Sequence, residues 1–315
     1  MAQITFADVL TDQRVAEILN AEYFRLAKDR NALPQHPALI YAKDFYGTGT
    51  LSLKIPFLGL DGYDLPTQVA EGASVGDSTV TDTTVSLSIA RYSKAYNPTD
   101  VTRFTDSLGV FNAAQFAQDA VLSHQLRLTD VIANLTDGFN ASVGTTTVNL
   151  SIATVASAIA TLEVASHAAL PIGSVMGILH GDQAGDFRTD LISNAGGALQ
   201  YNVPPERLRI MGNGYTGQFL GIDWFTSDYV PTANAGADRA GAIFIRGAVL
   251  WGDMSQVADS ADSVVIGNKV LFERERNARG AATAYISHSY LGATLGVDSS
   301  ALGHRYGVTI VSDAN

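Results

Sequence analysis

The sequence predicts a mixed α+β protein. Two short segments alternate apolar and polar residues with the period of a β-strand, and one stretch of about 30 residues repeats its apolar residues with the period of a helix. The second half interleaves short apolar runs with turn residues. A chain of 315 residues is long enough for one large domain or two interleaved ones.

The N-terminal part is predicted to begin with an amphipathic helix between residues 11 and 29. Val15, Ile18, Leu19 and Tyr23 fall on one stripe of that helix. The run NALPQHPALI then ends it, because proline cannot continue a helix. The residues that follow are predicted to be an extended arm or a frayed terminus.

Residues 51–55 and 85–89 each alternate apolar and polar side chains, which predicts a long β-hairpin. The stretch between them is crowded with Gly, Asp, Ser and Thr. Loops longer than about 15 residues are uncommon inside a compact domain and are usually functional or disordered. Because a two-stranded hairpin is marginal alone in water, it needs support. A neighbouring subunit is the simplest support.

Helical periodicity dominates residues 107–136, which predicts a rod of roughly 45 Å. Its apolar positions include Val110, Ala114, Ala117, Val121, Leu128, Ile132 and Leu135. No heptad continues beyond it, so a coiled coil is not expected. An Ala-rich second helix is predicted at 152–166, followed by short strands, turns and small helices.

Composition favours burial of the surface against other chains. Hydrophobic residues make up 46% of the chain and charged residues 16%, below the roughly 25% charged that is usual for a soluble domain. The formal net charge of -11 argues against broad attraction to nucleic acid and to anionic membranes.

The chain has no cysteine, which excludes disulfides, thiolate metal sites and a cysteine nucleophile. The start of the chain lacks the pattern of a secretory signal, and no apolar run reaches the roughly 18 residues of a membrane span. We therefore expect a soluble protein made in a cytoplasm, with no membrane association.

Gly212, Gly214 and Gly217 spell G-x-G-x-x-G, the dinucleotide-binding fingerprint. That fingerprint needs a helix at its last glycine, whose N-terminus binds the pyrophosphate. The segment QFLGIDWF alternates instead and predicts a strand, and Asn213-Gly214 is a type I′ turn signal. The match is interpreted as a hairpin, and no cofactor is expected.

His180, Asp182, Asp186 and Asp190 superficially resemble a metal site, with Asp186 and Asp190 one helical turn apart. The favoured interpretation is a strand end followed by a helix with an acidic first turn, which the helix dipole stabilises. No H-E-x-x-H, G-x-S-x-G or phosphate-loop lysine motif occurs. No metal site, catalytic residue or enzymatic activity is predicted.

The charged segment FERER, residues 272–276, predicts a strand with Arg274 and Arg276 on one face and Glu273 and Glu275 on the other. Two interpretations stay open for it. It is either a solvated edge strand or a face between subunits, where charge pairs fix register.

The order of these parts resembles the major capsid proteins of tailed bacteriophages, which have the Hong Kong 97 fold. The resemblance covers nearly the whole chain and is carried by the segments GTGTLSLKIP, VAEGASVGD, SIARYSKAYNPTDVTRFTDS and FERERNARG. It implies a coat protein that assembles into hexamers and pentamers of an icosahedral head enclosing double-stranded DNA. Heterologous contacts of this kind close into rings and shells.

The resemblance also implies a division of the chain. Residues 1–50 would be an N-terminal arm, 51–95 an extension loop, 96–148 and 258–288 a peripheral domain with a spine helix at 107–136, and 149–257 and 289–315 an axial domain. Contacts between subunits are hypothesised at Glu71, Asp77, Glu273, Arg274, Glu275 and Arg276.

Further partners and the location follow from the same resemblance. A portal and possibly decoration proteins would join the shell in the virion, after assembly in the cytoplasm of a bacterial host. Some relatives carry a long N-terminal scaffolding region, whereas the arm here begins within the first residues. A separate scaffolding protein or a segment already cleaved is therefore expected.

Some relatives weld their shells through a Lys–Asn isopeptide bond formed from the extension loop. The segment from Pro56 to Ala90 contains no lysine, so this crosslink is not expected. Two alternatives stay open: an encapsulin-like compartment shell and, from a different class, a nucleotide-binding enzyme using Gly212 to Gly217.

Overall fold

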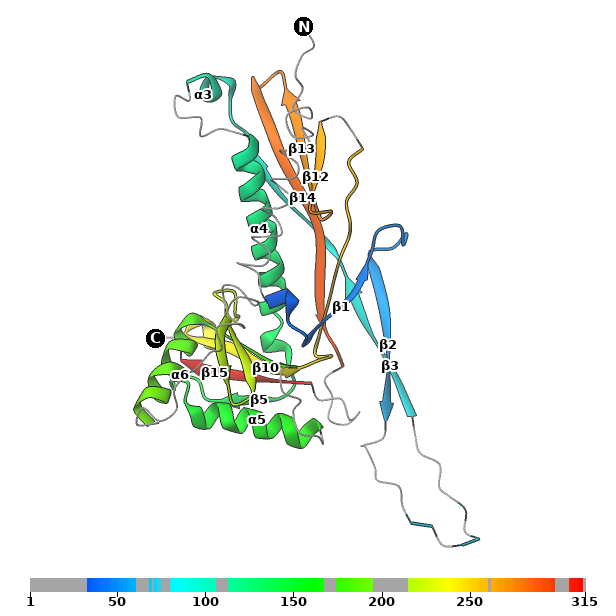
Figure 1. Ribbon diagram of the computed structural model, residues 1–315, viewed down its shortest axis with the longest axis vertical. Coiled ribbons are helices and arrows are strands. Elements are labelled where there is room, and N and C mark those ends of the chain that lie inside the picture. The colour runs from blue at the N-terminus through cyan, green and yellow to red at the C-terminus, as the bar shows by residue number, and fades with distance from the viewer. Residues whose placement is uncertain are drawn as a thin grey trace.

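The computed structural model describes residues 33–60, 68–69, 71–72, 74, 80–105, 113–166, 174–194, 215–259, 262–297 and 306–313. In these ranges the chain forms a six-stranded sheet, a seven-stranded sheet and a separate two-stranded hairpin (Figure 1). The predicted α+β class is confirmed. The helix predicted between residues 11 and 29 lies outside the described residues.

The six-stranded sheet brings together distant parts of the chain, in the order β1-β11-β14-β13-β12 with β4 also paired to β14. Strand β1 follows a short 3-10 turn, η1, and pairs in parallel with β11, about 200 residues later. The bounds are η1 Leu33–Gln35, β1 Leu39–Asp44, β4 Ala90–Tyr96, β11 Val249–Asp253, β12 Ser263–Ile266, β13 Val270–Asn277 and β14 Ala282–Leu295.

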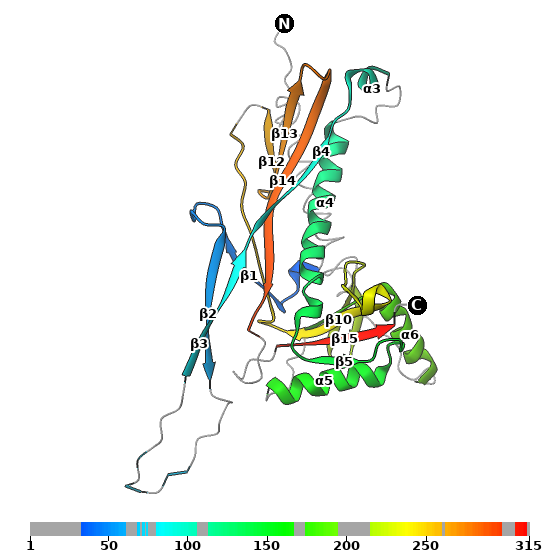
Figure 2. The same cartoon turned by 180° about the vertical axis from the view of Figure 1, so that it is seen from behind.

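Helix α4, Ala113–Ala133, lies along one face of this sheet (Figure 2). Its residues Ala117, Ala120 and Val121 pack against Phe272 of β13 and Tyr285 of β14. The small alanines let the helix approach the two rings closely.

The helix predicted at 107–136 is described only from Ala113, because residues 106–112 lie outside the described ranges. It ends at Ala133, before its predicted end, and a 3-10 turn, η2 Thr136–Gly138, follows. The Thr136 hydroxyl lies 2.7 Å from the carbonyl oxygen of Ala240 in the other sheet. This contact with the other sheet therefore lies just beyond the C-terminal end of α4.

The seven-stranded sheet has the order β5-β15-β10-β6-β8-β7, with β9 paired to β10. Helices α5 and α6 cover one of its faces, and η1 and the end of α4 lie toward the other (Figure 1). The bounds are β5 Ser142–Gly144, α5 Ile152–Ser166, β6 Val175–Leu179, α6 Gly181–Asn194, β7 Tyr215–Phe219, β8 Ile222–Thr226, β9 Thr232–Ala233, η3 Asn234–Gly236, β10 Asp238–Ile245 and β15 Gly307–Asp313. The predicted helix at 152–166 is confirmed by α5.

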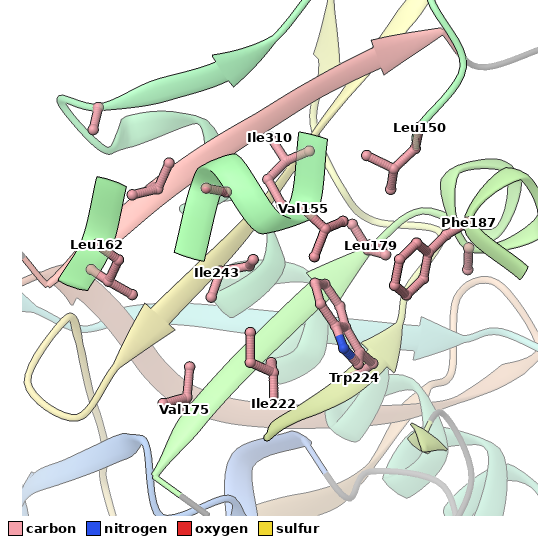
Figure 3. Packing of buried hydrophobic residues seen from close by; sticks show 14 residues of the cluster. Leu150, Val155, Leu162, Val175, Leu179, Phe187, Ile222, Trp224, Ile243 and Ile310 are labelled. Atoms are coloured by element: carbon pink, nitrogen blue, oxygen red, sulfur yellow. The ribbon is translucent and has the colours of Figure 1, made fainter. Parts of the chain in front are cut away.

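An apolar cluster fills the space between this sheet and its two helices (Figure 3). The rings of Phe187 and Trp224 lie 5.4 Å apart, and Trp224 is 1% exposed. A Cβ at Gly177 would lie 2.4 Å from the indole. Only glycine at this position therefore leaves room for the indole against strand β6.

The chain between η1 and β1 is fixed at the junction of the two sheets. His36 Nε2 lies 3.1 Å from a carboxylate oxygen of Asp223 on β8, and both side chains are buried. The backbone N–H of Ala38 donates to His36 Nδ1 at 3.1 Å. The ring is therefore the Nε2–H tautomer, which donates to Asp223.

The prediction of a single strand at QFLGIDWF is wrong, because this segment contains parts of two strands. Strands β7 and β8 form an antiparallel hairpin whose turn is Leu220-Gly221, with φ of 53° and 77°. Two positive φ values define a type I′ turn, which twists the strands correctly but usually selects Asn-Gly. A leucine at its first position carries no such signal, which is why the sequence pattern missed this turn.

Candidate intersubunit surfaces

Strands β2, Ser52–Leu60, and β3, Val80–Ser88, form a hairpin that projects away from both sheets (Figures 1 and 2). They pair in register over nine residues each, from Ser52 opposite Ser88 to Leu60 opposite Val80. Nine residues span about 30 Å. The predicted hairpin is confirmed over these two strands.

The base of the hairpin is fixed in its own subunit, where Leu87 and Phe45 are buried beside Met254 and Tyr290. Farther along, one face carries the half-buried Ile55, Phe57 and Val85, and the other carries exposed polar residues such as Lys54 and Ser86. The projecting part thus has an apolar face that the subunit covers only in part. Such a ribbon is marginal in water without a partner surface.

The segment between the strands is acidic. Residues 56–90 contain five acidic residues and neither lysine nor arginine: Asp61, Asp64, Glu71, Asp77 and Asp82. Glu71 is exposed, beside Gly72 with φ of 84°. Asp77 lies outside the described residues.

The second surface is the face of the six-stranded sheet opposite α4. Strand β14 alternates between buried residues under α4 (Thr283, Tyr285, Ser287 and Ser289) and half-exposed residues on the opposite face (Ala284, Ile286, His288 and Tyr290). Among the described residues no helix covers that opposite face, which we call the open face. An uncovered sheet face is available to another chain.

Glu273 lies on the open face within a small polar network. Its carboxylate is 3.4 Å from His288 Nε2, and His288 Nδ1 is 2.7 Å from the Ser93 hydroxyl. The pairing of Glu273 with a neighbouring strand was not predicted. His288 is separated from it by 15 positions and carries no sequence pattern that marks the contact.

Arg276 is held inside the subunit by α3, Asp100–Thr105, a helix that was not predicted. Its guanidinium binds both carboxylate oxygens of Asp100, at 2.8 and 2.6 Å, and donates to the Ala282 carbonyl at 2.9 Å. This bidentate geometry fixes the arginine head group. The Arg276 side chain as a whole stays 46% exposed.

The other two charged residues of FERER have different surroundings. Glu275 is exposed and lies opposite Ala284 in the ladder. Arg274 lies opposite Tyr285, and its backbone N–H donates to Asp262. A role of these residues between subunits stays a prediction.

A groove of about 740 Å³ lies around the turn from β13 to β14. Its lining includes Glu275, Arg276, Arg279, Asn97 and Asn277. Sequence reasoning missed Arg279 and Asn97. The turn NARG between two strands was the available signal.

Strand β4, at the edge of the sheet, carries its own charge network. Lys94 Nζ lies 2.6 Å from Asp119 of α4, and the Tyr96 hydroxyl binds the same carboxylate. Burial alone would raise the pKa of Asp119, but the hydrogen bonds from Lys94 and Tyr96 outweigh it and lower that pKa. A charged edge of this kind disfavours uncontrolled strand pairing.

The four residues whose pattern superficially resembles a metal site have separate partners. His180 pairs with Asp182 at 2.8 Å, Asp186 accepts from Asn149 at 3.3 Å, and Asp190 accepts the Ile152 N–H at 2.7 Å. The last contact satisfies a free N–H at the start of α5. No group of three possible metal ligands occurs in the described part of the chain.

The alternative of a nucleotide-binding enzyme requires a helix that begins at Gly217, and the structure has a strand there. Gly217 lies inside strand β7, at a bulge with φ of 129°, where a helix N-terminus is needed. Gly212, Asn213 and Gly214 lie outside the described residues, so their predicted turn stays a prediction.

Comparison with known proteins identifies the fold. No family model and no curated protein matches the sequence. The capsid of Ralstonia phage GP4 is 8% identical, with a TM-score of 0.59, and the match covers 91% of this chain and 92% of that one. The head structure of Helicobacter pylori bacteriophage KHP40 is 12% identical, with a TM-score of 0.57 and 90% of each chain covered.

The SrpI encapsulin complex from Synechococcus elongatus is also similar, at 10% identity and a TM-score of 0.54, over 87% of this chain and 86% of that one. The chain therefore has the α+β fold of bacteriophage capsid proteins, which the encapsulin shares. Among the described helices none is long and apolar enough to cross a membrane.

Proposed function

We propose that this protein is the major capsid protein of a tailed phage, with the Hong Kong 97 fold, and that it self-assembles into the icosahedral head around double-stranded DNA. Likeness to phage heads over about nine-tenths of the chain supports this. The observation that carries the proposal is the hairpin β2–β3, whose apolar face extends beyond the subunit.

The proposal includes the division of the chain given by the resemblance. The arm is residues 1–50, the extension loop 51–95, the peripheral domain 96–148 and 258–288, and the axial domain 149–257 and 289–315. The central part of the proposal is self-assembly into hexamers and pentamers. A separate scaffolding protein, a portal and decoration proteins are proposed partners, and assembly in the host cytoplasm precedes location in the virion.

We further propose that the acidic loop with Glu71 and Asp77 contacts the FERER strand of a neighbouring subunit. The loop carries only negative charge, and the groove at the β13–β14 turn presents Arg276 and Arg279. Complementary charge at an interface sets register and suppresses wrong pairings. The formal net charge of -11 suits a container whose packaged DNA must move without adhering.

An encapsulin-like compartment is the second candidate, favoured by the likeness to the SrpI encapsulin. Both candidates assemble into closed shells, so assembly alone does not separate them. The co-purified content does: a shell that packages DNA in the presence of portal and terminase supports the capsid, and one that encloses an enzyme supports the compartment.

The first test is assembly of the purified protein, with scaffold if required, by light scattering and negative-stain microscopy. Shells or rings of five or six are expected. Deleting residues 66–80 should leave a folded subunit that fails to form stable shells. A chain that stays monomeric under all conditions would refute the proposal.

The second test separates the two roles of Arg276. Arg274→Glu/Arg276→Glu should block assembly, whereas Arg188→Glu on the exposed face of α6, with half that charge change, is the control for a charge reversal away from this strand. The exchange Asp100→Arg/Arg276→Glu restores the pair within the subunit and reverses its polarity. Normal shells from the exchange would show that Arg276 acts only inside the subunit.

A third test concerns covalent bonds. Since residues 56–90 lack lysine, mature particles boiled in denaturant should give one band near 33.3 kDa. A ladder of multiples of that mass would contradict this.

A further inference from the structure

A polar bridge joins α4 to β14 within the otherwise apolar contact between them. His124 Nε2 lies 2.9 Å from the Ser287 hydroxyl, and Nδ1 lies 2.7 Å from the Ser289 hydroxyl. His124 is 6% exposed, and both serines are buried. We call these three residues the His124 bridge.

The hydrogen bonds fix the protonation state of the ring. The Ser287 hydroxyl donates to the carbonyl oxygen of Lys94 at 3.2 Å, so its oxygen accepts from Nε2–H. Nδ1 then accepts from the Ser289 hydroxyl. A neutral imidazole has one donor and one acceptor, and both are used here. A second proton on Nδ1 would require Ser289 to give up its donation.

The surroundings do not compensate a positive charge on His124. Lys94 of β4 lies on the same side of the sheet as His124, and His288 of β14 lies nearby on the open face. A cavity of about 50 Å³ beside the ring is also lined by Asp253 of β11 and Lys269. Asp253 already binds Lys269 at 2.8 Å, and Asp119 of α4 binds Lys94 at 2.6 Å. Burial lowers the pKa of His124 to about 4, and the charges of His288 and Lys94 act in the same direction.

We propose that protonation of His124 releases α4 from β14, so that acid loosens the six-stranded sheet before the seven-stranded sheet. The released histidine takes its proton at the ordinary pKa of about 6.5. While α4 is packed against β14, the pKa of His124 is about 4. The contribution of His124 to the stability of α4 packing is therefore complete above about pH 6.5 and is lost progressively as the pH falls toward 4.

The histidines beside the seven-stranded sheet contact carboxylates, whereas His124 contacts two hydroxyls. In the described residues its cluster under α5 and α6 contains no histidine. His36, at the junction, lies 3.1 Å from a carboxylate oxygen of Asp223, and His180, after β6, lies 2.8 Å from Asp182. The cavity beside His124 also leaves α4 room to shift, because the seam between helix and sheet is not filled.

Amide hydrogen exchange followed by mass spectrometry at pH 7 and pH 5, corrected for intrinsic rates, tests this on the intact protein. The opening constant of α4 amides should rise roughly 20-fold, as the two pKa values imply. Peptides of α5 should stay nearly unchanged. In His124→Gln, whose amide can donate and accept as the ring does but does not titrate, α4 should lose the acid response. His288→Gln is the matched control and should keep it.

An equal rise in α4 and α5, or an undiminished rise in His124→Gln, would overturn the proposal. If His124→Gln does not fold, His124→Asn takes its place. The unaltered protein tests the proposal without either variant. If its α4 opening constant does not rise between pH 7 and pH 5, the proposal is overturned.

Discussion

The two sheets of this subunit are covered differently. Every residue of β6, in the seven-stranded sheet, is buried, because α5 and α6 lie on one face and the junction with η1 and α4 on the other. Residues of β14, in the six-stranded sheet, alternate between buried and half-exposed. A sheet covered on both faces has reached its final burial within one chain. A sheet covered on one face keeps a surface for a second chain.

The largest expected effect is in the fully covered sheet. Trp224→Ala should lower the free energy of unfolding by about 3–5 kcal/mol, since the indole is buried against Phe187 and Gly177. Ile286→Ala, on the open face, should cost the isolated subunit only about 1 kcal/mol. Urea unfolding measures both. Equal losses would show that the open face is already part of the subunit's core.

The next prediction tests how tightly that sheet is packed. Gly177→Ala places a Cβ 2.4 Å from the Trp224 ring, and overpacking of this kind costs about 1–3 kcal/mol. Gly185→Ala is the matched control in α6, where nothing lies within 4 Å. There the loss of backbone freedom in the unfolded chain should raise stability by about 0.5–1 kcal/mol. Thermal melts should shift in opposite directions.

The turn of hairpin β7–β8 gives a smaller effect. Leu220 is 52% exposed and has φ of 53°, a conformation that costs an L-residue about 1–2 kcal/mol. Leu220→Asn should therefore stabilise the isolated subunit by about 1 kcal/mol. If the same variant weakens shells, the exposed leucine is a contact between subunits. A destabilised subunit would mean that Leu220 packs within its own chain.

The smallest effect is expected at the pair of Arg276 and Asp100, both of which are partly exposed. Arg276→Ala should change the stability of the subunit by less than about 1 kcal/mol, because solvent screens such pairs. A loss of several kcal/mol in chemical denaturation would place the arginine in the subunit's internal fold. If the stability changes by less than about 1 kcal/mol, the effect of Arg276→Ala on shell assembly reports the role of the arginine between subunits.

Elements with a strong periodic pattern could be predicted from the sequence. The helix at 152–166 and the hairpin strands around residues 51–55 and 85–89 follow from side-chain periodicity, which is a local property. The acidic loop without lysine, and the low charge of the whole chain, are likewise direct properties of the sequence.

Contacts between distant residues could not be predicted in this way. The pairing of β1 with β11, the bidentate contact of Arg276 with Asp100, and the two hydroxyls around His124 each join segments more than 150 positions apart. No local pattern marks such partners, since they are selected by packing. The turn at Leu220-Gly221 was missed because tertiary pairing of β7 with β8 overrides the propensity of leucine. The sequence by itself determined the period of its elements and the sign of its charge, whereas the tertiary structure decided which face of each sheet is covered, because burial depends on elements that meet only after folding.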